Sequence, residues 1–188
     1  PPSNSSDDFD LTVTATSTDG SDTATTTATL PVSVTGVADA ATVSGADASG
    51  TEDQAIALDI SVGDVQAGDT ASVTISGLPE GATLSAGEVN EDGSVTLSVE
   101  DLEGLTLTPA ANSDEDFTLT VVVTTTDGES GDTAPVSDTM DVSVAADADT
   151  PSLSINAASG AEDTAIDLDI SAALTDTDGS ETLSVEIS

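Results

Sequence analysis

The stretch Phe117-Thr118-Leu119-Thr120-Val121-Val122-Val123 places a large apolar side chain at every second position. A period of two is typical of a β-strand with one buried face, because successive side chains point to opposite faces of a sheet. Similar alternation recurs along the chain, in the sets Ile56, Leu58 and Ile60; Val73 and Ile75; Val95, Leu97 and Val99; Leu105 and Leu107; and Met140, Val142 and Val144. These short runs, separated by turn residues such as Asp127-Gly128, predict an all-β fold.

The sequence also repeats itself with a period of about 110 residues. Phe9 and Phe117 lie in matching stretches 108 positions apart, and Val73 and Val185 lie in stretches 112 positions apart. The matching stretches are Asn4 to Val13 with Asn112 to Val121, Glu52 to Ile60 with Glu162 to Ile170, and Val73 to Ser76 with Val185 to Ser188. A unit of this length is a whole domain, since the repeats of solenoid proteins are much shorter.

This repeat predicts the domain organisation. We expect residues 1–36 to be the C-terminal part of one repeat, 37–147 to be a complete repeat, and 148–188 to be the N-terminal part of the next. About seven short strands in a full repeat predict tandem antiparallel β-sandwiches of the cadherin-like or immunoglobulin-like class. Because the pattern starts and stops within a repeat, we expect the sequence to belong to a longer chain.

Composition restricts the chemistry of any site. The chain has 37 Asp and Glu residues and no Lys, Arg or His, so no basic side chain can neutralise a carboxylate. Without Cys and His, the usual Zn and Cu sites are excluded, and oxygen ligands for hard cations remain. Without Lys and Arg, direct binding of nucleic acid is not expected. The sequence has no apolar run long enough to span a bilayer, so we expect no direct membrane insertion in this segment.

Acidic residues gather in the loops between the expected strands. In an up-and-down arrangement, loops 61–69, 87–93 and 109–116 are expected at the end of the repeat where the chain leaves through Asp149. The next repeat is expected to begin there with its Glu-Asp pair. Carboxylates that converge in this way would build a cage of about 6 to 8 oxygen ligands for Ca²⁺ at each junction between repeats. The candidate ligands are Asp39, Glu52, Asp53, Asp64, Asp69, Asp114, Asp116, Asp149, Glu162, Asp163, Asp176, Asp178 and Glu181.

The stretch Asp176-Thr177-Asp178-Gly179 also has a simpler interpretation as an ordinary turn. Asp and Gly tolerate the backbone angles of tight loops, and the spacing to a later Glu excludes an EF-hand. For Asp127 and Asp132 we favour a solvated turn. The loop with Asp64 and Asp69 lacks the second Asp and the Glu of the later copy, so it is expected to hold a weaker ion or none.

Four motifs share their pattern with a known family: Glu162 to Ile170, Asp176 to Leu183, Asn112 to Phe117, and the Thr-rich run Thr12 to Gly20. As a set they resemble the tandem cadherin-like extender repeats of giant bacterial RTX adhesins, over the whole chain, although the Gly-rich nonapeptide of RTX calcium rolls is absent. The resemblance implies a secreted protein at the bacterial cell surface whose repeats are rigidified by Ca²⁺. It also implies a spacer role in adhesion or biofilm formation, with neighbouring repeats as partners and an anchor and distal ligand-binding domains elsewhere.

Other functions predict different properties. A glycosidase needs a positioned carboxylate pair and usually aromatic platforms, but Phe9 and Phe117 are the only aromatic residues, so no enzyme activity is expected. An acidic surface-layer domain of a halophile would be stabilised by monovalent salt. Thr arrays such as Thr23 to Thr29 could form a carbohydrate- or ice-binding face, although alternating Thr is also typical of the wet face of a strand.

Overall fold

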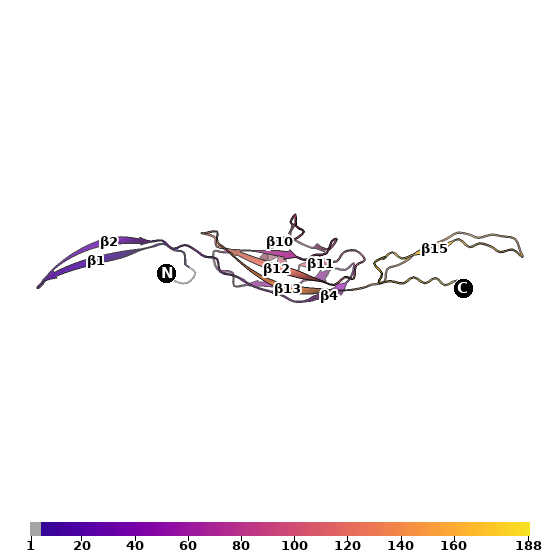
Figure 1. The fold of residues 1–188 in the computed structure, drawn as a ribbon, viewed down its shortest axis with the longest axis horizontal. Coiled ribbons are helices and arrows are strands. Elements are labelled where there is room, and N and C mark those ends of the chain that lie inside the picture. Colours follow the sequence, from indigo (N-terminus) through magenta and orange to yellow (C-terminus); the bar gives the residue numbers. More distant parts are fainter. Residues whose placement is uncertain (1–4) are drawn as a thin grey trace.

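The computed structural model describes residues 5–188 and shows an all-β protein, as the sequence predicts. It has three parts, a first hairpin, a central part with most of the strands and a last strand pair, which follow one another along the long axis of the molecule (Figure 1). The strands are β1 (Phe9–Asp19), β2 (Asp22–Val32), β3 (Thr42–Gly45), β4 (Ala48–Thr51), β5 (Ile56–Ala57), β6 (Ile60–Gly63), β7 (Thr70–Ser76), β8 (Thr83–Leu84), β9 (Glu88–Val89), β10 (Val95–Ser98), β11 (Thr106–Thr108), β12 (Phe117–Thr126), β13 (Thr133–Ala145), β14 (Ser152–Ile155) and β15 (Ile170–Ala173).

The central part, from β3 to β13, contains the hydrophobic core. A six-stranded sheet with the order β4-β13-β12-β7-β10-β9 packs with a three-stranded sheet, β5-β11-β8, and a two-stranded sheet, β3-β6. Alternate residues of β12 (Leu119, Val121 and Val123) are fully buried, and their neighbours in the strand are more accessible. Apolar residues from all three sheets belong to one buried cluster, so this part is β-sandwich-like. The alternation in the sequence therefore predicts the core correctly.

One strand pair departs from the antiparallel arrangement that the sequence predicts. β4 runs parallel to β13, with Ala48 beside Val142 and Thr51 beside Ala145. This pair places β4, the second strand of the central part, beside its last strand. Glu52 directly follows β4 and therefore lies near the point at which β13 ends, where its amide donates to the carbonyl of Ala145.

The outer parts reproduce strand pairs of the central part. In the hairpin β1–β2, Phe9 lies opposite Val32, just as Phe117 lies opposite Val142 in β12–β13. The same hydrogen bonds occur at the open end of both hairpins. One Asp carboxylate accepts from a Ser hydroxyl and from the backbone amide of the residue after that Ser. The two sets are Asp8 with Ser33 and Val34, and Asp116 with Ser143 and Val144. The pair β14–β15 likewise matches β3–β6.

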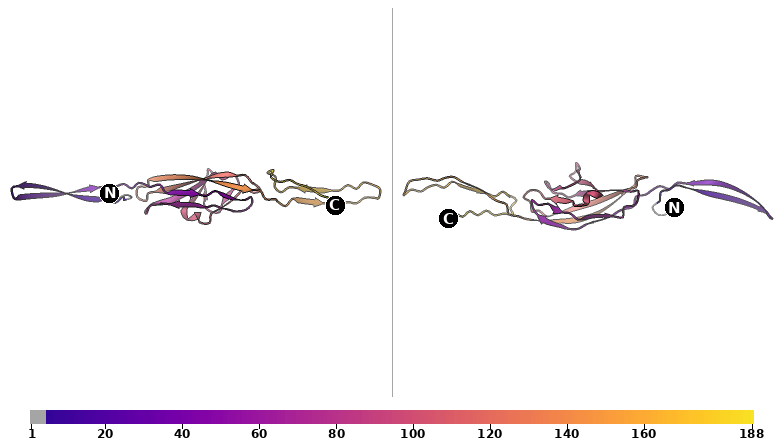
Figure 2. Two further views of the ribbon diagram at one scale, coloured as in Figure 1. Left: turned by 90° about the horizontal axis from the view of Figure 1, so that it is seen from below. Right: turned by 180° about the vertical axis from the view of Figure 1, so that it is seen from behind.

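Side chains at equivalent positions differ in burial because the outer parts have fewer neighbouring strands among the described residues. Leu119 in β12 is fully buried, whereas Leu11 at the same position of β1 is 46% exposed. Figure 2 shows the outer hairpins extending from the two ends of the central part as thin two-stranded ribbons. Residues 1–4 of the first expected domain lie outside the described residues.

Within residues 5–188 the only helical element is a 3-10 turn, η1 (Val99–Leu102). Its first turn is closed by Asp101, whose carboxylate accepts hydrogen bonds from the amide of Ser98 at 2.9 Å and from its hydroxyl at 2.6 Å. Among the same residues, no helix has the length and apolar character needed to cross a bilayer.

Candidate metal centre

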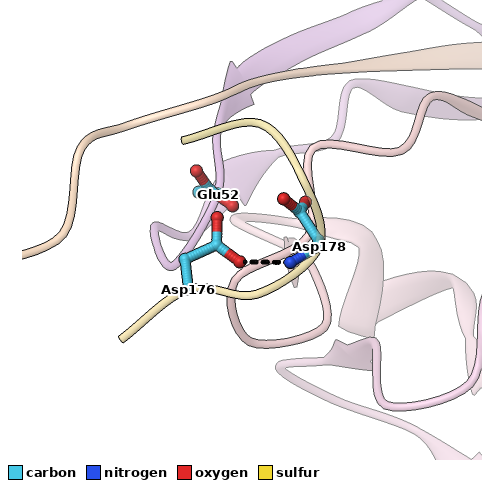
Figure 3. A group of neighbouring side chains, drawn as sticks. All are labelled: Glu52, Asp176 and Asp178. Atoms are coloured by element: carbon cyan, nitrogen blue, oxygen red, sulfur yellow. Dashed lines mark hydrogen bonds between the residues drawn. The ribbon is translucent and has the colours of Figure 1, made fainter. Parts of the chain in front are cut away.

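Three carboxylates from two different parts of the chain meet at the junction that follows β13. Glu52 comes from the end of β4 in the central part, and Asp176 and Asp178 come from the loop after β15. One carboxylate oxygen of each lies within 4.8 Å of the other two. Figure 3 shows Glu52 and Asp176 facing each other across the junction, with Asp178 beside them on the same loop as Asp176. Among the described residues this is the only such group of three.

The burial of this group separates it from an ordinary acidic surface. Glu52 is 2% exposed and Asp176 is 1% exposed, whereas Asp178 is exposed. Oε1 of Glu52 accepts a hydrogen bond from the amide of Asp147 at 2.7 Å, but its Oε2 has no hydrogen-bond partner. A buried carboxylate oxygen without a donor is costly, because its water of hydration is lost and not replaced. A cation in the group would supply what the protein lacks.

Electrostatic repulsion raises the free energy of the three ionised carboxylates. The hydrogen bond from the amide of Asp147 acts to lower the pKa of Glu52. Burial opposes it, and so does repulsion from Asp176, Asp178 and Asp114. The net result is a pKa for Glu52 above the ordinary value of a glutamate. Since the chain has no basic side chain, nothing in the protein can offset this charge.

The loop that carries Asp176 and Asp178 is held in shape by its own hydrogen bonds. The amide of Asp178 donates to Asp176 Oδ1 at 2.9 Å, and the Ser180 hydroxyl donates to Asp176 Oδ2 at 2.8 Å. The Ser180 amide and hydroxyl lower the pKa of Asp178, which keeps this carboxylate ionised. Gly179 adopts a φ of 110°, which only glycine tolerates well. The loop can therefore be an ordinary Asp-Gly turn and still present the carboxylates of Asp176 and Asp178 to a cation.

A second set of contacts ties the linker to both sides of the junction. The amide of Asp149 donates to Oε1 of Glu181, and the side-chain amide of Asn112 donates to Asp149 Oδ2 at 2.6 Å. The backbone amide of Asn112 donates to Asp53 Oδ1 at 3.1 Å. Oε2 of Glu181, like that of Glu52, is buried without a hydrogen-bond partner. The junction thus contains two buried carboxylate oxygens that could bind a cation.

The expected position of loop 61–69 is wrong. Thr42 pairs with Gly63, so the end of β6 lies beside the start of β3. The loop after β6 therefore lies at the other junction of the chain, between β2 and β3, which we call the first junction; the junction after β13 is the second. Asp69 and Asp39 help to line a cavity of about 370 Å³ there, together with Gln66, Asp127 and Glu129. Asp64 is exposed in the same loop, with a φ of 58°. The loop does not join Asp149.

The expected position of Glu162 and Asp163 is also wrong, because their loop lies at the opposite end of its strand pair. Ser152 pairs with Ala173 near the junction and Ile155 pairs with Ile170 further away, so loop 156–169 closes the far end of β14–β15. Both acidic side chains are exposed in that loop, at the position that Glu52 and Asp53 occupy in the central part. They therefore lie at the end of β14–β15 that points away from the junction after β13.

Two residues of the junction were not predicted as functional. Asn112 positions both Asp53 and Asp149, and its φ of 54° is a value that Asn tolerates better than most residues. The only sign of this role in the sequence is that an Asn precedes the acidic loop in both copies of the repeat. Asp147 contributes through its amide, which no side-chain pattern reveals. A comparison with protein-family models and a comparison with curated proteins each find no match for this chain.

Proposed function

We propose that this chain is a segment of structural extender repeats from a secreted bacterial cell-surface adhesin. In this proposal the three parts belong to tandem β-sandwiches, and Ca²⁺ at a junction makes neighbouring repeats rigid so that they project a distal binding domain. One observation carries the proposal: Glu52 of one repeat and Asp176 of the next are both buried at their junction, and an oxygen of Glu52 has no donor.

The donor set favours Ca²⁺ over other cations. Only oxygen ligands are present, and carboxylates that come from two different parts of the chain suit an ion that accepts about 6 to 8 oxygens in variable geometry. Mg²⁺ requires stricter octahedral geometry and gives up its water reluctantly. Glu52, Asp176 and Asp178 would be the first ligands, and Glu181 would add a further buried oxygen nearby.

The mechanical effect follows from the position of the carboxylates. Without a cation, like charges on the two repeats repel one another and favour bending away from the junction. A divalent ion bound by Glu52 and Asp176 together would join residues from both sides of a short linker. The chain would then stay extended along the long axis seen in Figure 1.

A calcium titration of the chelator-treated protein tests the proposal. We expect heat of binding with Ca²⁺ and an increase in the melting temperature that Na⁺ at equal ionic strength does not reproduce, together with a longer maximum dimension in small-angle scattering. The paired substitution Asp176→Asn and Asp178→Asn should abolish these effects, and Asp167→Asn, at an exposed position outside the group, should not. Equal effects of Na⁺ and Ca²⁺ would instead favour the acidic surface-layer domain.

One observation favours a second candidate function, a ligand-binding face. Four Thr pairs lie directly opposite one another on one face of the hairpin β1–β2: Thr12 and Thr29, Thr14 and Thr27, Thr16 and Thr25, and Thr18 and Thr23. A regular array of hydroxyl and methyl groups without charge could bind neutral carbohydrate or ice. Glycan-array and ice-affinity measurements, with Thr16→Val and Thr25→Val as the matched loss of hydroxyls, distinguish this face from a passive spacer surface.

A further inference from the structure

Two short edge strands of the central part, β8 and β9, border one cavity. β9 is the last strand of the six-stranded sheet, and β8 is the last strand of the three-stranded sheet. Each is paired over two residues with a single neighbour, and among the described residues no strand pairs with its other side. A free edge presents backbone N–H and C=O groups that can pair with an added strand. The sandwich is therefore open along this side.

The cavity between these strands, which we call the edge slot, has mostly apolar walls. Its volume is about 370 Å³, and its lining includes Leu78, Leu84, Ala86, Val89 and Val95. A cavity of this size falls within the range of pockets that bind ligands. All of its lining residues lie within 78–95, well inside the central part, so the slot involves neither the outer parts nor the junctions.

The apolar residues of the two edge strands face the core. Val89 lies opposite the buried Val95. Leu84 lies opposite Leu107, which is fully buried. Because residues directly opposite in an antiparallel pair share a face of the sheet, Val89 and Leu84 both lie on the inner faces of their sheets. Val89 is nevertheless 71% exposed, so the core is not filled at this edge.

The β9–β10 hairpin holds the slot in shape. The side-chain amide of Asn90 donates to the hydroxyls of Ser94 and Thr96, in both cases at 2.9 Å. The connection from β8 to β9 passes close against β10, because a Cβ atom built on Gly87 would lie 2.5 Å from Cγ1 of Val95. A site whose shape is fixed before binding loses less conformational entropy when a ligand docks.

The mouth of the slot is acidic. Glu80 lines the slot, and Glu88 precedes Val89 in β9. Glu88 lies on the outer face of the sheet, since successive residues of a strand alternate between faces. Both glutamates are exposed, and the chain has no basic residue that could neutralise them. This charge disfavours a second copy of the same chain as the occupant and favours a cationic partner.

From these features we propose that the edge slot docks an extended segment of a partner protein in which apolar and basic side chains alternate. The segment would pair with the free edge of β9 as an added strand, which is a recurring mode of peptide recognition. One apolar side chain would enter the slot beside Val89, and the next residue, on the opposite face, would place Lys or Arg near Glu88. This inference goes beyond the proposed function, because it gives the central part a binding site of its own.

Two synthetic peptides of equal composition test the inference with the full chain in excess Ca²⁺. In one peptide Ile and Lys alternate, and in the other the same residues stand in two blocks. Anisotropy of a fluorescent label on the peptide measures binding at physiological ionic strength, where salt screens exposed charges. We expect the alternating peptide to bind about tenfold more tightly, because only its strand has one apolar face to bury. Equal affinities would overturn the inference.

The substitution Val89→Asp separates docking in the slot from simple charge attraction. It adds a negative charge, so attraction alone would strengthen binding of the alternating peptide, whereas loss of the apolar wall should weaken binding about tenfold. Val37→Asp, at a side chain that is 69% exposed and outside the slot, is the matched control and should not weaken binding. Stronger or unchanged binding by Val89→Asp would overturn the inference.

A charge reversal tests the chemistry of the partner without altering the apolar walls. Glu88→Lys should weaken binding of the alternating Ile and Lys peptide and strengthen binding of a peptide in which Ile and Glu alternate. Amide hydrogen exchange locates the contact, and exchange within 83–89 should slow when the Ile and Lys peptide binds the wild type. No change of preference in Glu88→Lys, or slower exchange only outside 78–95, would show that the segment does not dock at this edge.

Discussion

Glu52 and Asp176 face each other with carboxylate oxygens within 4.8 Å, although they are 124 positions apart in the chain and each is almost completely buried. Two like charges at this distance in a partly desolvated site repel each other strongly. The closed junction is therefore stable only if a proton or a cation offsets the charge.

Replacing Glu52 with Gln should have opposite effects in the absence and presence of calcium. Without Ca²⁺, the neutral side chain keeps its shape and removes the repulsion from Asp176, so the melting temperature should rise by about 2–5 °C. With Ca²⁺, the same variant loses a ligand and should gain less stability than the wild type. Scanning calorimetry in chelator and in Ca²⁺ measures both effects. Glu88→Gln, at an exposed edge strand, is the control, and a decrease in melting temperature in chelator would contradict the explanation.

The carboxylate of Asp101 should make the stability of the central part depend on acid pH. The hydroxyl and amide of Ser98 lower the pKa of Asp101, so its contribution is present above the ordinary aspartate pKa of about 3.9 and is lost as pH falls through the lower folded value. Asp101→Asn should therefore reduce the melting temperature at pH 7. The difference from the wild type should shrink as the pH falls through the lowered pKa of Asp101 in the folded protein, because both side chains are then neutral. A difference that is independent of pH would point to packing instead of charge.

Leu119 and Leu11 should respond very differently to the same substitution. Leu119→Ala removes a fully buried side chain and should reduce the free energy of unfolding by about 2–5 kcal/mol. Leu11→Ala alters the equivalent position, which is 46% exposed, and should cost less than about 1 kcal/mol. Urea unfolding followed by far-ultraviolet circular dichroism gives both values. Similar losses in the free energy of unfolding for the two variants would mean that Leu11 is also buried in solution.

Gly50 and Gly160 form a second matched pair. A Cβ atom at Gly50 would lie 2.5 Å from Cγ1 of Ile56, which is buried in the core and cannot move aside. Gly50→Ala should therefore destabilise the central part by about 1–3 kcal/mol. At Gly160 the same atom would lie 2.6 Å from Cγ1 of Ile166, which is 46% exposed and can rotate away. Thermal unfolding of the two variants checks this, and equal destabilisation would contradict it.

Most of the core could be predicted from the sequence, because burial in a sheet follows a period of two and Leu119, Val121 and Val123 show it without interruption. The connections between strands were harder to predict from the sequence. The strands β3 and β4 show no alternation of large apolar residues, so they were not counted and the loop after β6 was placed at the wrong end. As a result Asp69 and Glu162 were assigned to the wrong ends of their repeats.

The candidate site could be predicted in part. Glu52, Asp176 and Asp178 were found because acidic residues recur at loops, which is a property of the sequence alone. Their burial could not be predicted, since it depends on how the linker brings two repeats together. Asn112 and the amide of Asp147 act through hydrogen bonds whose partners are more than 30 positions away in the chain. Such contacts leave no local pattern.

The parallel pairing of β4 with β13 also determines how the central part would resist a pulling force. Tension along the long axis draws β4 toward the N-terminal side and β13 toward the C-terminal side. Because the two strands are parallel, these forces act along them in opposite directions. The pairs from Ala48 with Val142 to Thr51 with Ala145 are therefore loaded together in shear. Rupture then requires their hydrogen bonds to break at once, whereas an antiparallel hairpin pulled at its open end would unzip one pair at a time.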